Sequence, residues 1–247
     1  MILSAPLLML LPLLPAAVPL AQKSPPLRQA PVSAATVWRF EIRDSSLRAV
    51  APGAKAVVLW DSTQNTTTSS ASEDDEEEIC SETSSAEPRS LAGTVATWFS
   101  RTSSYCSNIA HPSSSSRFAT RDLVTGDEAD LRRIFPPAAL LAALSRDKVV
   151  LKAVGKVPQS LEQIEKGDGG CEIGFSPSMW RSFAFHHLQG DSVAVRIGLT
   201  HGCEAARGNF TQLGVLLPIP EAWKQPLLDA ASRGLLMKNL TEKHRAN

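Results

Sequence analysis

The chain of 247 residues is poor in aromatic side chains and carries no excess charge of either sign. Tyr105 is the only tyrosine, aromatic residues make up 6% of the chain, and 25 Lys and Arg residues balance 25 Asp and Glu residues. A nucleic-acid platform needs several stacking aromatic side chains on a basic surface. We therefore expect no nucleic-acid partner.

The first segment lacks both charged residues and cysteine. Met1–Gln22 has no charged side chain, and Leu7–Leu14 is an apolar run. This run has the length of a signal-peptide core and is shorter than the roughly 18–20 apolar residues of a membrane-spanning helix. We predict a signal peptide over residues 1–22, with an uncleaved membrane anchor as the alternative. The processed chain would be periplasmic or secreted and would not span a membrane.

Several motifs of common enzymes are missing as well. Gly174–Ser178 lacks the second glycine of the G-x-S-x-G elbow and has Pro177 beside the serine. His186 and His187 are adjacent and would point to opposite sides of a strand, so they do not replace a His-Glu-x-x-His zinc motif. Gly167–Gly170 has no following lysine and no strand-turn-helix context. Serine-hydrolase, zinc-peptidase and P-loop chemistry are therefore not indicated.

The four cysteines form an even set, and their spacings are too wide for a CxxC metal or redox motif. An exported protein meets oxidising conditions, which favour disulfides. Three connectivities are open. We expect sequence neighbours to pair, Cys80 with Cys106 and Cys171 with Cys203; four free thiols are the alternative.

Composition divides the rest of the chain. Residues 23–34 are a proline-rich leader that we predict to be disordered. Residues 61–90 are rich in Ser and Thr and include the acidic run Glu73–Glu78, so we predict a flexible insertion that cannot bury enough apolar area to fold. The insertion lies in a predicted N-terminal subdomain over residues 35–135, and a C-terminal subdomain follows over residues 136–247.

Apolar periodicity predicts the secondary structure. Strands are expected at Thr36–Arg43, Lys55–Trp60, Thr94–Phe99, Phe118–Val124, Cys171–Phe175 and Thr211–Leu217. Helices are expected just before Phe135 and at Ala138–Val154, Ser160–Glu165 and Glu221–Ser232, followed by a polar tail at Leu235–Asn247 that frays. Strands interrupted by separate helices, without a regular repeat, predict an α+β fold with mostly antiparallel sheets, a few packed helices and two subdomains.

Phe183–Leu199 is the clearest hairpin in the sequence. If Gly190 and Asp191 form a type II′ turn, Gln189 pairs with Ser192 and the register follows from there. The predicted core face carries Ala184, His186, Leu188, Val193, Val195 and Ile197, and the opposite face carries Phe183, Phe185, His187, Ala194, Arg196 and Gly198. His186 would then be a core histidine with a hydrogen-bond partner, and His187 beside Arg196 is a candidate for a binding surface.

The stretch Tyr105–Leu144 resembles a known family. Its order of residues is similar to the paired uncharacterised domains in the extracytoplasmic part of RsiV-type anti-sigma factors, a pair that also precedes the catalytic domain of some peptidoglycan deacetylases. The residues that carry the resemblance are Tyr105, Ala110-His111-Pro112, Asp122-Leu123, Thr125-Gly126, Leu131 and Phe135. The stretch Tyr105–Leu144 makes up about a sixth of the chain.

The resemblance implies a recognition role, for lysozyme in the anti-sigma relatives and for cell-wall glycan in the deacetylase relatives. We therefore expect a secreted or periplasmic non-catalytic binding domain, without a cofactor, for a lysozyme-like envelope protein or a peptidoglycan fragment. The candidate binding residues are Tyr105, His111, His187, Arg196, His201 and Glu204. The alternative is a metal-dependent or acid-base envelope hydrolase in which His187, His201 and Glu204 converge. A third possibility is a structural envelope protein without a small ligand.

Overall fold

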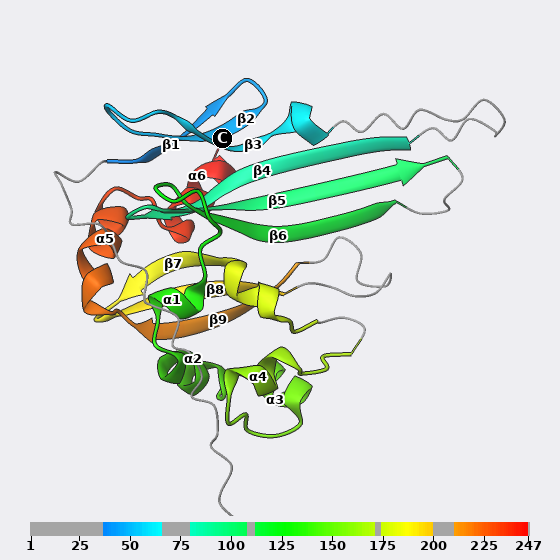
Figure 1. Ribbon diagram of the computed structural model, residues 1–247, viewed down its shortest axis with the longest axis vertical. Coiled ribbons are helices and arrows are strands. Elements are labelled where there is room, and N and C mark those ends of the chain that lie inside the picture. The colour runs from blue at the N-terminus through cyan, green and yellow to red at the C-terminus, as the bar shows by residue number, and fades with distance from the viewer. Residues whose placement is uncertain (1–36, 66–79, 108–111, 171–173, 200–209, 247) are drawn as a thin grey trace, which may run out of the picture.

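The computed structural model describes residues 37–65, 80–107, 112–170, 174–199 and 210–246 (Figure 1). These ranges contain three three-stranded antiparallel sheets and a set of short helices, which confirms the predicted α+β class. In Figure 1 the three sheets lie above one another, and the sheet from the middle of the sequence lies between the other two. The predicted signal peptide and leader fall outside the described residues.

The first sheet consists of β1 (Arg39–Arg43), β2 (Ser46–Val50) and β3 (Val57–Asp61). The first and third of these strands were predicted, but β2 was not. Asp44 adopts a positive φ of 53° between β1 and β2, a conformation that Asp tolerates better than most residues. The tight turn reverses the chain direction, so that β2 pairs antiparallel with β1. The side chains of Leu47 and Ala49 on β2 are buried.

The middle sheet consists of β4 (Cys80–Ala92), β5 (Val95–Cys106) and β6 (Ser113–Asp122). The predicted flexible insertion over residues 61–90 is therefore wrong from Cys80 onward. Its composition is polar, but β4 is held by a backbone ladder to β5 that runs from Cys80 opposite Cys106 to Ala92 opposite Val95. The amino-acid composition of a segment does not reveal whether its backbone pairs with a distant strand. This is why a flexible insertion was predicted here.

The third sheet consists of β7 (Phe183–Gln189), β8 (Ser192–Leu199) and β9 (Thr211–Pro218). The predicted turn and the pairing of Gln189 with Ser192 are confirmed, and Gly190 has the positive φ of 57° that the turn requires. A bulge lies between Phe185 and His187.

The bulge changes which side chains enter the core. An extra residue in one strand reverses the alternation of faces beyond it. Phe185 therefore pairs with Val195 and Phe183 with Ile197, and all four side chains are buried. The predicted assignment of Phe183 and Phe185 to the outer face is wrong for this reason.

The middle sheet contributes to two hydrophobic cores. One core lies between it and the first sheet and includes Trp38, Leu47 and Trp98. The other joins it to the third sheet and the helices and includes Val95 and Phe135 together with the buried side of β7–β9. Residues from both sides of the predicted boundary at residue 135 thus share one core.

The helices cover the third sheet and the ends of the sheets (Figure 1). They are α1 (Leu131–Ile134), α2 (Pro137–Leu144), α3 (Lys148–Val154), α4 (Leu161–Glu165), α5 (Glu221–Ser232) and α6 (Met237–Ala246). No helix within the described ranges is both long and apolar enough to cross a membrane.

Two helix predictions need correction. The single helix predicted at Ala138–Val154 is two helices, because the carboxylate of Asp147 accepts hydrogen bonds from the N–H groups of Val149 and Val150 and begins α3 there. The tail that was expected to fray is α6, which contacts β4 and β7. Tertiary contacts stabilise this short polar helix, whereas its own sequence would not.

Candidate functional site

The middle sheet extends beyond the other two sheets at one end (Figure 1). We call this part the distal end and define it as residues 80–85 of β4, 101–106 of β5 and 113–117 of β6. Most of these residues are serine or threonine, and no residue of the three segments belongs to either hydrophobic core. Exposed side chains lie on both faces of the distal end, Tyr105 and Arg101 on one face and Arg117 on the other.

Strand register places the only tyrosine on one of these faces. Tyr105 lies opposite Ser81, and Arg101 lies opposite Ser85 on one side and Ser116 on the other. Residues two apart in a strand share a face. The face, which we call the Tyr105 face, carries Tyr105, Arg101, Ser81, Thr83, Ser85, Ser103, Ser114 and Ser116.

The Tyr105 face offers a particular chemistry. The Tyr105 side chain is 48% exposed and its cross-strand neighbour, Ser81, is short. Each hydroxyl both donates and accepts hydrogen bonds, and the Arg101 guanidinium donates only. The arrangement can therefore stack against a flat apolar surface and hydrogen-bond a polar ligand, and the residues of this face include no His, Asp or Glu.

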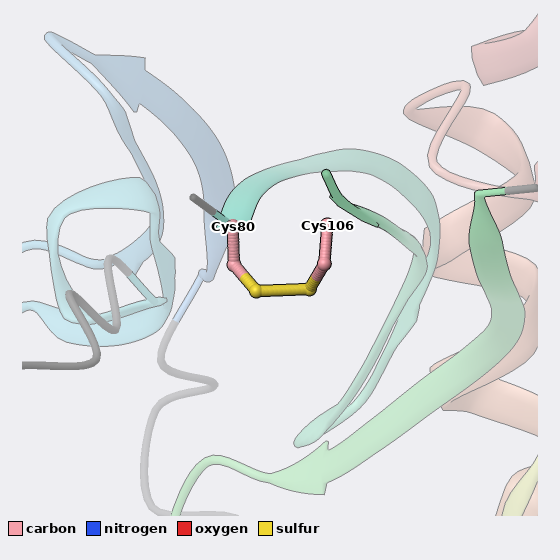
Figure 2. Close-up of a disulfide and its surroundings, with 2 residues drawn as sticks. All are labelled: Cys80 and Cys106. Carbon is pink, nitrogen blue, oxygen red and sulfur yellow. A yellow bond between two sulfur atoms is a disulfide. The ribbon is translucent and has the colours of Figure 1, made fainter. Parts of the chain in front are cut away.

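A disulfide closes the distal end. Cys80, the first residue of β4, is bonded to Cys106, the last residue of β5 (Figure 2). This confirms the first of the two predicted pairs. Cys171 and Cys203, the second predicted pair, lie outside the described residues.

The predicted candidates His187 and Arg196 belong to a different part of the molecule, the third sheet. Nδ1 of His186 lies 2.7 Å from Nδ1 of His187, so the two rings share a hydrogen bond through a single proton. Burial lowers the pKa of His186 from 6.5, and the positive charge of Arg196 lowers it further. His186 is thus half-buried and paired with its neighbour, and it does not lie in the core as predicted.

Of the remaining candidates, Tyr105 lies on β5 of the middle sheet, away from His187 and Arg196. His111, His201 and Glu204 lie outside the described residues. Within the described ranges, no group of three His, Cys, Asp or Glu side chains is placed to hold a metal ion. The convergence of His187, His201 and Glu204 stays a prediction.

A shallow groove of about 460 Å³ runs between α1, α2 and α4 and has Arg132 and Glu165 in its wall. Arg132 forms ion pairs with Asp130 at 2.7 Å and Glu165 at 3.2 Å, and its guanidinium lies over the ring of Trp180. The hydrogen bond to Asp130 raises the pKa of Arg132. Because these charges already satisfy one another, the groove is better explained as the place where α1 and α4 are joined.

Neither Arg101 nor Arg117 was predicted from the sequence as a candidate, and neither were the serines and threonines of the distal end. The serines and threonines of residues 80–85 were attributed to a disordered segment. The sequence did contain a signal for this pairing. The polar residues 81–85 follow Cys80 and the polar residues 101–105 precede Cys106, so a disulfide between the two cysteines places the two segments side by side.

No family model, curated protein or solved structure matches this chain. The resemblance of Tyr105–Leu144 to the accessory domains of RsiV-type anti-sigma factors and peptidoglycan deacetylases therefore stays a prediction.

Proposed function

We propose that the protein is a secreted or periplasmic, non-catalytic binding domain for an envelope ligand, and that the distal end of the middle sheet is its binding surface. The observation that supports this most directly is the exposed Tyr105 among hydroxyl side chains, on a sheet end that neither core covers. A segment without core contacts contributes little apolar burial to stability. Its regular structure is therefore better explained by recognition than by packing.

The disulfide supports the proposed location. Disulfides persist in the periplasm and outside the cell, and they are rare in reducing compartments. Cys80–Cys106 joins the outer ends of two strands whose side chains bury little apolar surface there. The uncharged apolar segment Met1–Gln22 favours the same location.

The composition of the Tyr105 face supports recognition. Tyrosine supplies a large, rigid contact surface with few rotatable bonds, and serine supplies adaptable hydrogen bonds, as in antibody binding loops. Placement on paired strands fixes these groups more rigidly than a loop would. A lysozyme-like protein and a peptidoglycan fragment both present polar groups and flat apolar surfaces that suit such a face.

The test is calorimetric titration of the purified protein with lysozyme and with muropeptides. Tyr105→Ala is expected to weaken binding at least about tenfold if the ring is an interface anchor. Leu228→Ala is a matched control, because Leu228 is 53% exposed on α5 and lies outside the distal end. Absence of heat with both ligands, or equal loss in both variants, would contradict the proposal.

A further inference from the structure

The two edges of the middle sheet differ. The sheet order places β4 and β6 at its edges. The register of β4 shifts between Pro88 and Ser90, and a bulge and a proline are features that protect an edge from pairing. β6 pairs with β5 without a shift from Ser113 to Asp122. Its outer edge is therefore regular.

The direction of the free backbone groups on β6 follows from one hydrogen bond. The N–H of Asp122 donates to the carbonyl oxygen of Asp127, which lies outside the sheet, at 2.9 Å. Backbone groups in a strand point alternately to its two sides. Since β6 has no register shift, Ser116 and Ser114 also direct their N–H and C=O groups outward.

The inner part of this edge is covered and the distal part is not. Near Asp122 the N–H of Asp122 donates to the carbonyl oxygen of Asp127, and the N–H of Gly126 donates to the carbonyl oxygen of Asp122. In the described part of the chain, no strand pairs with β6 on its outer side. The hydroxyl of Ser116 is shielded from solvent and has no hydrogen-bond partner there.

We propose that the outer edge of β6 at Ser114–Ser116 binds an extended acidic peptide segment of a partner protein as an added strand. The proposal rests on the proposed binding function and deepens it, because it names the mode of binding and the chemistry of the partner. Strand addition draws its affinity from main-chain hydrogen bonds and its selectivity from side chains on the two faces.

Two arginines define that selectivity. Arg117 lies on β6 and points to the face opposite Tyr105, and Arg101 lies beside Ser116 on the Tyr105 face. Neither arginine forms an ion pair with a described residue. An incoming strand would place one residue opposite Arg117 and the adjacent residue opposite Ser116, on the face of Arg101. Acidic side chains at these two adjacent positions would reach one guanidinium on each face.

The same residues disfavour a second copy of this chain as the occupant. The segment Ser113–Arg117 contains four serines and one arginine, so two copies paired edge to edge would offer no acidic group to Arg117. A glycan would not satisfy the outward backbone groups in strand register. An acidic peptide is the occupant that fits both the backbone and the charges.

The experiment uses the full chain with its disulfide intact and a synthetic ten-residue peptide of alternating Thr and Val with a central Asp-Glu pair. Amide hydrogen exchange measured by NMR should show that the amides of Ser114 and Ser116 become protected when the peptide is added. A matched peptide with Asn-Gln at the centre should bind about tenfold more weakly, because it lacks the charge-assisted hydrogen bonds.

Three variants sharpen the test. Ser116→Pro removes an outward N–H at an edge position where proline is tolerated, so it should abolish peptide binding without unfolding the sheet. Arg117→Glu should weaken binding of the acidic peptide about tenfold and favour a peptide with a central Lys-Lys pair. Leu228→Ala, a change of an exposed residue on α5 outside the distal end, should leave peptide binding unchanged.

The proposal is overturned if the peptide does not bind, if Ser116→Pro binds it as the native chain does, or if the acidic and amide peptides bind equally. Protection of Ser114 and Ser116 that rises with protein concentration alone would also overturn it, in favour of self-pairing. If the peptide does not bind but binding of muropeptide or lysozyme depends on Tyr105, only the strand-addition proposal is overturned. If the peptide binds and neither envelope ligand does, the proposed envelope function fails.

Discussion

The inner and distal halves of the middle sheet share three strands and one hydrogen-bonding ladder, yet they differ in everything else. In the inner half Trp98 contributes to the core with the first sheet, and Val95 contributes to the core with the third sheet. In the distal half the same strands carry Ser, Thr and Arg on both faces, with Tyr105 on one of them. The comparison shows that backbone pairing extends a sheet, whereas apolar side chains decide where other sheets pack on it.

The largest effect is expected from removing a packed aromatic ring in the inner half. Phe118 on β6 is 2% exposed and lies in edge-to-face contact with Phe210. Phe118→Ala should lower the free energy of unfolding by about 3–5 kcal/mol, because it removes buried surface and leaves a cavity. Urea unfolding followed by tryptophan fluorescence measures this. A loss below about 1 kcal/mol, the size of an average substitution, would contradict the described packing.

The next largest effect concerns the covalent link of the distal half. Cys80 and Cys106 are separated by 26 residues, and replacing both by serine should lower the unfolding free energy by about 3–4 kcal/mol in the loop-entropy description. Proteolysis of the folded variant should begin within the distal segments of β4 and β5, because no core residue holds them. Cleavage that begins in the third sheet would contradict this expectation, because it would show that the disulfide stabilises the packed part of the molecule.

A smaller, pH-dependent effect on stability is expected from His186 on β7 of the third sheet. Burial, and then Arg196, lower the pKa of His186 from 6.5. The folded state therefore binds this proton less readily than the unfolded chain, so stability is full above pH 6.5 and is lost as the pH falls through the lowered pKa. Urea midpoints should decrease in acid for the native chain and decrease less for His186→Gln. Identical pH profiles would refute the assignment to His186.

The smallest effect is expected in the distal half. Ser114 lies on the same strand and face as Phe118 and is partly exposed. Ser114→Ala should change the unfolding free energy by less than about 0.5 kcal/mol, because no apolar packing is lost. The same urea titration measures both positions and gives the contrast between the halves directly. A decrease in the unfolding free energy as large as that of Phe118→Ala would contradict the difference in packing between the inner and distal halves.

Much of the fold could be predicted because its signals are local. The alternating strands and the turn at Gly190 each depend on a few neighbouring residues, and the structure contains both. Of the three open connectivities, pairing of sequence neighbours was expected, and the bond between Cys80 and Cys106 confirms it for this pair. Errors arose where one residue broke the pattern, as at the bulge near His186 and at the cap Asp147.

The candidate site was predicted only in part, because its residues are gathered by strand pairing. Tyr105 was identified as a candidate, whereas Arg101 and Arg117 were not, since neither lies in a recognisable motif. Their significance comes from a register that places Arg101 next to Ser116. His187 and Arg196 were expected near one another, and both lie on the third sheet.

The sequence by itself determined the α+β class and most of the strand and helix positions, because apolar periodicity and turn residues act over short distances. It favoured the Cys80–Cys106 pair but left three disulfide connectivities open, and the structure decided among them for this pair. Only the tertiary structure decided that the polar segment after Cys80 is a strand, that the middle sheet packs on both faces at one end, and that its other end is exposed. Those features depend on contacts between residues far apart in the chain, and composition alone does not encode which distant segment will supply a backbone or an apolar partner.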